Sequence, residues 1–145
     1  MRLLKWRGKG IPPSKIIIDK QTLNRLAMHS AECIPNEACG ILHGIIKQDT
    51  YIVQDVTFVE NIAKSPIQFS ISNEDTIQAY DNSMDVVGIY HSHPTSLAIP
   101  SETDREYMHV NPVAWVIHSG VDHTFRAWHM DDDIHEIAIQ TENTA

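Results

Sequence analysis

With 145 residues, of which 42% are hydrophobic and 21% charged, the chain has the length and balance of one soluble domain with a buried core. It shows neither an apolar run near the roughly 18 residues of a membrane span nor the pattern of a signal peptide, which favours a cytoplasmic protein without a membrane partner. The net charge of −8 makes non-specific binding to nucleic acid unfavourable. Two cysteines, Cys33 and Cys39, are too few for a disulfide scaffold or a zinc ribbon.

The basic residues are concentrated at the start of the chain. Residues 1–18 carry five Lys and Arg side chains and no acid, which leaves six basic and nineteen acidic residues, a net of −13, for the remainder. We expect residues 1–14 to form a basic leader, 15–140 the domain and 141–145 a polar tail. The leader is interpreted either as a solvated segment or as a docking arm with apolar anchors at Leu3, Leu4 and Trp6.

In the first half of the domain, β-branched runs typical of strands are interrupted by one stretch with helical spacing. Ile16-Ile17-Ile18 is typical of a buried strand, and Leu23 and Leu26 recur at a helical interval. The predicted elements are a strand at 15–19, a helix at 20–32, a hairpin of strands at 38–47 and 51–59, and a short strand at 67–71.

The second half contains the most apolar strand of the chain. The run Val86-Val87-Gly88-Ile89-Tyr90 is typical of a central strand covered on both faces. The predicted elements are a helix at 73–82, a strand at 85–91, a loop at 95–100, a helix at 102–108, and strands at 114–119, 124–130 and 134–140. This order predicts a single α/β domain with one mixed, curved β-sheet flanked by helices.

The most informative motif is His91-Ser92-His93, followed by Ser101 and Asp104. Side chains alternate along a strand, so the imidazoles of His91 and His93 share one face. Asp104 can return to that face across one loop, and two His with one carboxylate and a free fourth position is the ligand set of a hydrolytic zinc site. Zinc lowers the pKa of a bound water from about 15.7 toward 7, which makes hydroxide available at neutral pH.

At these residues the chain resembles the JAMM (MPN-plus) metalloprotease family. The family pattern is an upstream Glu, then His-x-His, seven residues, Ser, two residues and Asp, and this chain matches it from His91 to Asp104. The stretch from Pro35 to Gly44 resembles the segment that carries the Glu. The resemblance spans roughly residues 15–140 and implies a compact, prokaryotic-type MPN domain with a cytidine-deaminase-like sheet and one Zn²⁺ per chain.

The resemblance implies a role for each of five residues. His91, His93 and Asp104 would ligate zinc. Glu37 would hold and deprotonate the zinc-bound water, and Ser101 would donate a hydrogen bond to the oxyanion. Two structural alternatives stand beside these roles, because Ser101 with Asp104 is also a capping-box variant at a helix start, and Glu37 alone would be a solvated loop acid.

The resemblance also implies hydrolysis of the peptide or isopeptide bond after the C-terminal Gly of ubiquitin, a ubiquitin-like protein or a sulfur-carrier protein. Such a protein is therefore the expected partner, and a homodimer or larger assembly is left open. About eight residues follow Asp104 before the next strand, too few for a second insertion, whereas residues 61–71 could form a short first insertion beside the groove.

Two other classes compete with this interpretation. A non-catalytic MPN scaffold is the main alternative, although such relatives have generally lost the ligands that this chain retains. The zinc nucleoside deaminases need His-x-Glu and Pro-Cys-x-x-Cys, which the chain lacks. Among the remaining residues, Cys39, Trp115 and Trp128 are predicted to be core, Ser92 to pack on the opposite face, and the other histidines repeat no ligand pattern.

Overall fold

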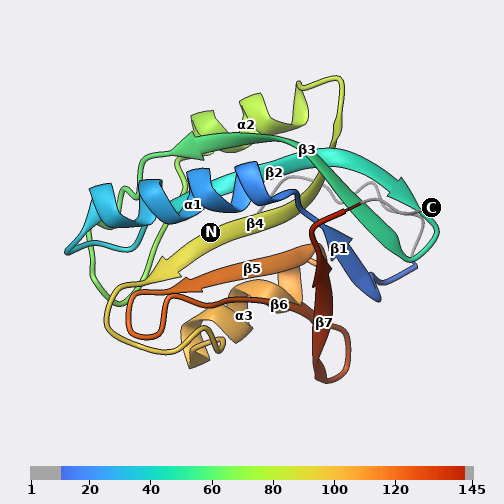
Figure 1. The fold of residues 1–145 in the computed structure, drawn as a ribbon. Coiled ribbons are helices and arrows are strands. Elements are labelled where there is room, and N and C mark those ends of the chain that lie inside the picture. Colours follow the sequence, from blue (N-terminus) through green and yellow to red (C-terminus); the bar gives the residue numbers. More distant parts are fainter. Residues whose placement is uncertain (1–10, 143–145) are drawn as a thin grey trace.

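The computed structural model describes residues 11–142, and within them seven strands form one closed, mixed sheet accompanied by three helices (Figure 1). The strands are β1 (Lys15–Ile17), β2 (Cys39–Lys47), β3 (Thr50–Val59), β4 (Asp85–His93), β5 (Ala114–Ser119), β6 (Phe125–Met130) and β7 (Ile134–Gln140). The helices are α1 (Lys20–Cys33), α2 (Asn73–Tyr80) and α3 (Glu102–Val110). Most of the basic leader, residues 1–10 with the apolar anchors of the docking arm, and residues 143–145 of the tail lie outside the described residues.

The sheet has the order β1-β3-β2-β4-β5-β6-β7 and closes because β1 pairs in parallel with both β3 and β7. β4 lies at the centre of this order, antiparallel to β2 and parallel to β5, and every β4 residue after Asp85 is buried. The structure confirms the predicted mixed, curved sheet and its central strand. The closure was not predicted, since a strand of three residues carries no signal for the two distant strands that it joins.

Each helix begins at a side chain that caps its first turn. Asp19 accepts a hydrogen bond from the Thr22 N–H (2.7 Å) at the start of α1, and Ser72 accepts one from the Asp75 N–H (3.0 Å) at the start of α2. The three predicted helices are thereby confirmed, although α2 ends two residues earlier and α3 two residues later than predicted. Within residues 11–142, no helix has the length and apolar character to cross a membrane.

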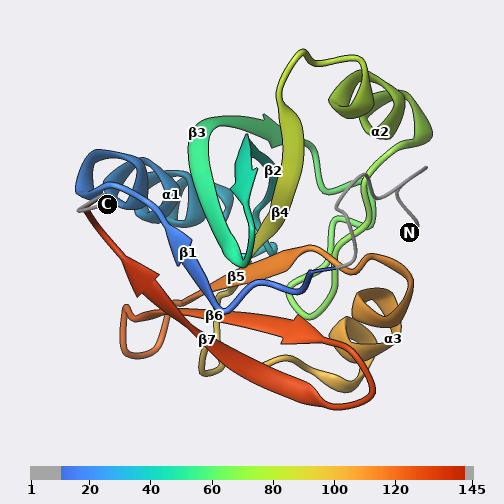
Figure 2. The same ribbon diagram turned by 90° about the vertical axis from the view of Figure 1, so that its right-hand side faces the viewer.

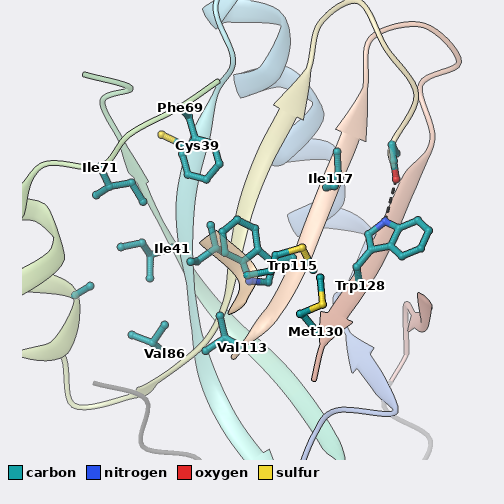
Figure 3. Packing of buried hydrophobic residues seen from close by; sticks show 14 residues of the cluster. Cys39, Ile41, Phe69, Ile71, Val86, Val113, Trp115, Ile117, Trp128 and Met130 are labelled. Carbon is teal, nitrogen blue, oxygen red and sulfur yellow. Dashed lines mark hydrogen bonds between the residues drawn. The ribbon is translucent and has the colours of Figure 1, made fainter. Parts of the chain in front are cut away.

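Alternate residues of the sheet enter two hydrophobic layers on its opposite faces. In one layer, Leu26 of α1 packs with sheet residues that include Tyr90. In the other, Ala79 of α2 and Met108 of α3 pack with a layer that contains Trp115 (Figure 3). Figure 2 shows the same division, with α1 on one side of β4 and the other two helices on the far side. We call these two sides of the sheet the α1 side and the α3 side.

The residues that were predicted to be core are buried in the α3-side layer. Cys39, Trp115 and Trp128 all belong to it, and burial raises the pKa of the Cys39 thiol to about 12. The Trp128 indole N–H donates to the Ala98 carbonyl (2.9 Å), the hydrogen bond drawn in Figure 3. These large side chains therefore form the hydrophobic layer beneath the site and are not exposed for stacking on a substrate.

One predicted strand is wrong. Residues 67–71 belong to an irregular loop, residues 60–72, which we call the β3–α2 loop. Phe69 and Ile71 are buried, which accounts for the apolar pattern that favoured a strand. The Asn61 side chain hydrogen-bonds the carbonyl of Gln68 and the N–H of Ser70, two backbone groups that a neighbouring strand would bind in a sheet. These groups are therefore satisfied although the backbone is irregular.

Candidate metal site

The end of β4 brings two imidazoles together on the α3 side of the sheet. His91 and His93 are 0% and 3% exposed, and their Nε2 atoms lie 3.2 Å apart. The centroids of the Trp115 and His91 rings lie 5.9 Å apart. The two imidazoles therefore lie against the hydrophobic layer of the α3 side. The prediction that both imidazoles share a face of one strand is confirmed.

Asp104 reaches the same point from the first turn of α3. Its Oδ2 atom lies 3.0 Å from the Nε2 of His91 and 3.0 Å from the Nε2 of His93. The same oxygen accepts the Ser101 N–H (2.9 Å), while the Ser101 Oγ accepts the Asp104 N–H (3.1 Å), which completes a capping box. The capping box is therefore present, and the carboxylate oxygen that completes it is the one that contacts both imidazoles.

A hydrogen bond on the far side of the His93 ring decides which nitrogen carries hydrogen. The Nδ1 atom lies 2.8 Å from the Leu97 carbonyl oxygen, and because a carbonyl can only accept, Nδ1 is the donor. In the neutral ring, Nε2 then presents a lone pair to the Asp104 carboxylate at 3.0 Å. Two acceptors at this distance repel each other unless a cation lies between them, either a proton or a metal ion.

The spacing of the three donor atoms fits a metal ion. The Nε2 atoms of His91 and His93 and a carboxylate oxygen of Asp104 all lie within 4.8 Å of one another. Tetrahedral zinc with ligands at about 2.0–2.2 Å places neighbouring ligand atoms about 3.3–3.6 Å apart, a few tenths of an ångström more than the 3.0 Å and 3.2 Å observed here. Imidazole nitrogen with carboxylate oxygen is also a donor set that suits zinc.

The local charges favour the state that binds a cation. Burial disfavours the Asp104 carboxylate, but the imidazoles of His91 and His93 and the Ser101 N–H outweigh burial and hold its pKa well below the usual range. Burial likewise disfavours a charged His93, yet its contacts with Asp104 and Leu97 raise the pKa of the ring. A metal ion bound here would replace a proton that the cluster otherwise holds.

Glu37 lies beside the cluster, just before β2. Cys39 pairs with His91 in the antiparallel register of β2 and β4, so Glu37, two residues earlier, falls opposite His93. The Glu37 side chain is 3% exposed, and its Oε1 has no hydrogen-bond partner among the described residues. Burial raises the pKa of Glu37 to about 7, although the charges of His91 and His93 oppose the shift. Glu37 is therefore a buried carboxyl group and not a solvated loop acid.

A cavity of about 460 Å³ adjoins Glu37 between the end of α1 and the β3–α2 loop. Its walls include His29 and Cys33 from α1 and Phe58 from β3. These walls belong to the α1 side of the sheet, so the cavity adjoins Glu37 from the side opposite the two imidazoles.

A family model described as prokaryotic homologs of the JAB domain matches residues 19–131, more than half of the chain. The chain belongs to this family. The JAMM/MPN resemblance that the His, Ser and Asp spacing indicated is thus confirmed.

Curated relatives and solved structures are consistent with this assignment. A desampylase of Pyrococcus furiosus is 38% identical over 85 residues, which are 56% of this chain and 58% of the relative. The chain spans about half the length of the curated relatives it matches. The solution structure of a Desulfitobacterium hafniense protein is similar with a TM-score of 0.77 and 26% identity, over 86% of this chain and 90% of that chain. A JAB1/MPN domain protein from Archaeoglobus fulgidus has the same α/β fold, with a TM-score of 0.56 and 17% identity over 91% of this chain and 98% of that chain.

The JAB-family site contains contacts that sequence reasoning missed. Phe69 stacks on the ring of His91, with 4.7 Å between centroids and 27° between planes. The Leu97 carbonyl orients His93, and Asn61 binds the backbone of Glu37. The only sequence signal among these contacts is Asn61, a polar residue two positions after the end of a strand, and such residues are common in loops of every kind.

The other histidines of the JAB-family domain stay apart from this cluster. His118, His129 and His135 lie on β5, β6 and β7, and none of them contributes to the metal cluster. Across residues 11–142, the His91–His93–Asp104 cluster is the one group of three or more His, Cys and acidic donors close enough to share a metal ion.

Proposed function

We propose that this chain is a zinc-dependent hydrolase that cleaves the peptide or isopeptide bond after the C-terminal Gly of a ubiquitin-like or sulfur-carrier protein. In this proposal His91, His93 and Asp104 hold the zinc ion. Glu37 transfers the proton, and Ser101 donates a hydrogen bond to the oxygen that gains charge. The observation that carries the proposal is the convergence of three buried donor atoms, from His91, His93 and Asp104, to within 4.8 Å of one another, a spacing that one metal ion can bridge.

Zinc at this position would act as a Lewis acid and would lower the pKa of a coordinated water toward 7. The role of Glu37 follows from its surroundings. A carboxyl group whose pKa burial has raised to about 7 can both accept a proton and return it to a leaving amine near neutral pH. Its Oε1 atom has no partner among the described residues and so remains free to accept that proton.

The Ser101 hydroxyl is suited to two tasks at once. Its oxygen accepts the Asp104 N–H (3.1 Å), which uses a lone pair and leaves the hydroxyl hydrogen unused by the cap. Ser101 can therefore donate that hydrogen to a developing oxyanion while the start of α3 stays capped. The same cap holds the Asp104 carboxylate against the two imidazoles, so donor and ligand are fixed by one short segment.

A ubiquitin-like substrate is supported by the similarity to the desampylase and by the surface beside the site. The two loops that contact His91 and His93 carry apolar side chains that are 41–73% exposed: Ile62, Ile67, Leu97 and Ile99. A folded partner can cover such a surface, while its flexible Gly-Gly tail is thin enough to enter a narrow groove. Cys33 and Cys39 are both free, which supports the cytoplasm as the proposed location.

The decisive experiment is incubation of the purified chain with a panel of ubiquitin-like and sulfur-carrier proteins that bear C-terminal extensions, read by intact mass. We expect loss of the extension directly after Gly, abolition by a chelator, and recovery on addition of zinc. Zinc bound at about one ion per chain, together with no cleavage of any member of the panel, would favour the scaffold alternative.

A further inference from the structure

We propose that Asn61 is the positioning residue of this site, through which the β3–α2 loop sets both the Glu37 carboxyl group and the ring of His91. The inference rests on the proposed function for its catalytic meaning. Asn61 touches neither the metal donors nor the reacting atoms, and it acts only through the residues that it holds.

The Asn61 carboxamide uses its complete hydrogen-bonding capacity. Its Nδ2 donates to the carbonyl oxygens of Glu37 (3.0 Å) and Gln68 (3.0 Å). Its Oδ1 accepts the backbone N–H groups of Ala63 (3.0 Å) and Ser70 (3.1 Å). An amide side chain has two N–H donors and two acceptor lone pairs, so all four are engaged, and the side chain is almost entirely buried.

The β3–α2 loop binds both backbone polar groups of Glu37, its carbonyl oxygen and its N–H. The Glu37 carbonyl accepts from Asn61, and the Glu37 N–H donates to the Ser65 carbonyl (2.9 Å), which lies within the same loop. β2 begins only at Cys39, so neither backbone group of Glu37 belongs to the sheet ladder. The loop therefore binds both backbone groups of Glu37, whereas the next residue, Ala38, is bound to Ser92 of β4.

The other end of the same loop supports His91. Phe69, between the two residues Gln68 and Ser70 that Asn61 holds, is 1% exposed and stacks on the His91 ring at 4.7 Å. It enters the α3-side layer from the loop (Figure 3).

The two rings of the cluster are oriented by different means. The Nδ1 of His93 donates to the Leu97 carbonyl, whereas the Nδ1 of His91 is buried without a partner among the described residues. Metal-binding histidines normally gain their orientation from such a second hydrogen bond. The His91 ring is instead held by packing against Phe69 and Trp115, so its orientation depends on the loop that Asn61 closes.

The test uses Asn61→Asp in the full chain, a substitution of nearly equal volume. It keeps an oxygen to accept from Ala63 and Ser70 but replaces the amide donor with an oxygen that faces the carbonyls of Glu37 and Gln68. The matched control is Asn82→Asp, because Asn82 only accepts, from the Met84 N–H (2.9 Å), and its bond survives the change. Asn61→Ala, which removes both halves, is added as a second variant.

Three readouts are measured for each variant: zinc content, amide hydrogen exchange, and kcat and KM on a substrate that the panel experiment identifies. We expect Asn61→Asp to fold and bind about one zinc ion, to lose exchange protection at the Glu37 N–H, and to lower kcat about 10–100-fold with little change in KM, the size of effect that follows a small misplacement of a catalytic group. Asn61→Ala should also lose protection at Ala63 and Ser70. Asn82→Asp should match the wild type in all three.

Unchanged protection at Glu37 in Asn61→Asp, or a kcat equal to that of Asn82→Asp, overturns the positioning role. The exchange result separates this proposal from the assignment of an activity. If the wild type cleaves no member of the panel, the hydrolase proposal fails, while loss of protection at Glu37 with zinc content retained still supports Asn61 as the residue that positions it, and retained protection still overturns that role.

Discussion

The two faces of β4 differ in how the polar side chains of its last four residues are hydrogen-bonded. On the α1 side, Tyr90 and Ser92 are satisfied by ordinary hydrogen bonds. The Tyr90 hydroxyl donates to the Leu26 carbonyl (3.1 Å), and the Ser92 Oγ accepts the Ala38 N–H (2.8 Å), which confirms the packing role predicted for Ser92. Both hydroxyl oxygens on this face of β4 therefore have hydrogen-bond partners within the chain.

On the α3 side, the polar groups do not satisfy one another without a cation. The Nε2 of His93 and the Oδ2 of Asp104 lie 3.0 Å apart and need a proton or a metal ion between them. A carboxyl oxygen of Glu37 and the Nδ1 of His91 have no partner among the described residues. Burial of unmatched polar groups is unfavourable by about 1–3 kcal/mol each. Unpartnered buried imidazole nitrogens also occur at His43, His118 and His129, so a single unmatched atom does not mark the site. The α3 face of β4 differs because its unmatched groups lie around three donors that can share a metal ion.

The largest effect is expected from removing a ligand on the α3 side. His91→Ala and Asp104→Ala should each reduce the zinc content from about one ion per chain to near zero, because two remaining donors cannot hold the ion in competition with water. Elemental analysis after dialysis measures this directly. His135→Ala is the matched control, since His135 also lies 3.0 Å from an aspartate, Asp131, but both are about half exposed. Equal zinc content in Asp104→Ala and His135→Ala would refute the ligand assignment.

Glu37→Gln should have the next largest effect, and on turnover alone. The amide keeps the size of the side chain but cannot take a proton, so zinc content should stay near one ion per chain while hydrolysis falls by about 10²–10⁴, the usual contribution of a general base. Rates on the substrate identified by the panel, with zinc measured on the same samples, test this. Glu106→Gln, which removes an exposed charge from α3, controls for the loss of one carboxylate. Turnover retained in Glu37→Gln would remove Glu37 from its role as base.

Sequence reasoning could find the metal cluster because its parts are local. His91 and His93 are separated by one residue on a strand, and the alternation of side chains along a strand does not depend on the rest of the fold. Ser101 and Asp104, three positions apart, form the capping box that marks the start of a helix. The strand and the helix start then only need to face each other across one loop.

The loop over the site could not be found in the same way. Residues 67–71 were predicted as a strand because Phe69 and Ile71 alternate with polar residues. Both side chains are buried, but the backbone that carries them is an irregular loop. Its path is set by the four hydrogen bonds of Asn61, and a single Asn after a strand predicts no particular partners. The closure of the sheet by the three residues of β1 was missed for a similar reason, since register with distant strands leaves no local pattern.

Ser101→Ala is expected to have two smaller effects that a matched variant separates. Loss of the hydroxyl donor should slow turnover by about 10²–10³ with zinc retained, and loss of the cap should lower the free energy of unfolding by about 1 kcal/mol. Ser72 caps α2 by the same kind of bond, from the Asp75 N–H at 3.0 Å, but lies outside the metal cluster. Ser72→Ala should therefore show the loss of stability without the loss of rate. Equal rates in the two variants would leave Ser101 with a capping role only.

Tyr90→Phe probes the opposite face of β4 and should have the smallest effect. The change removes a hydroxyl that donates to the Leu26 carbonyl, so we expect a loss of about 1–1.5 kcal/mol in the free energy of unfolding, measured by urea denaturation. Tyr51→Phe, which removes a hydroxyl bound to the Ile11 carbonyl at 2.9 Å, is the control for losing one buried tyrosine hydrogen bond.

Zinc affinity should be equal in Tyr90→Phe, Tyr51→Phe and the wild type. Tyr90 neighbours His91 in sequence, but its ring lies in the α1-side layer, where the Tyr90 hydroxyl and the Ser92 Oγ bind groups that do not belong to the metal cluster. A tenfold loss of zinc affinity in Tyr90→Phe alone would show that the two faces of β4 are coupled. In that case the ring of His91 would depend on the strand beneath it as well as on Phe69, and the division between a satisfied face and an unsatisfied one would not describe how this site is held.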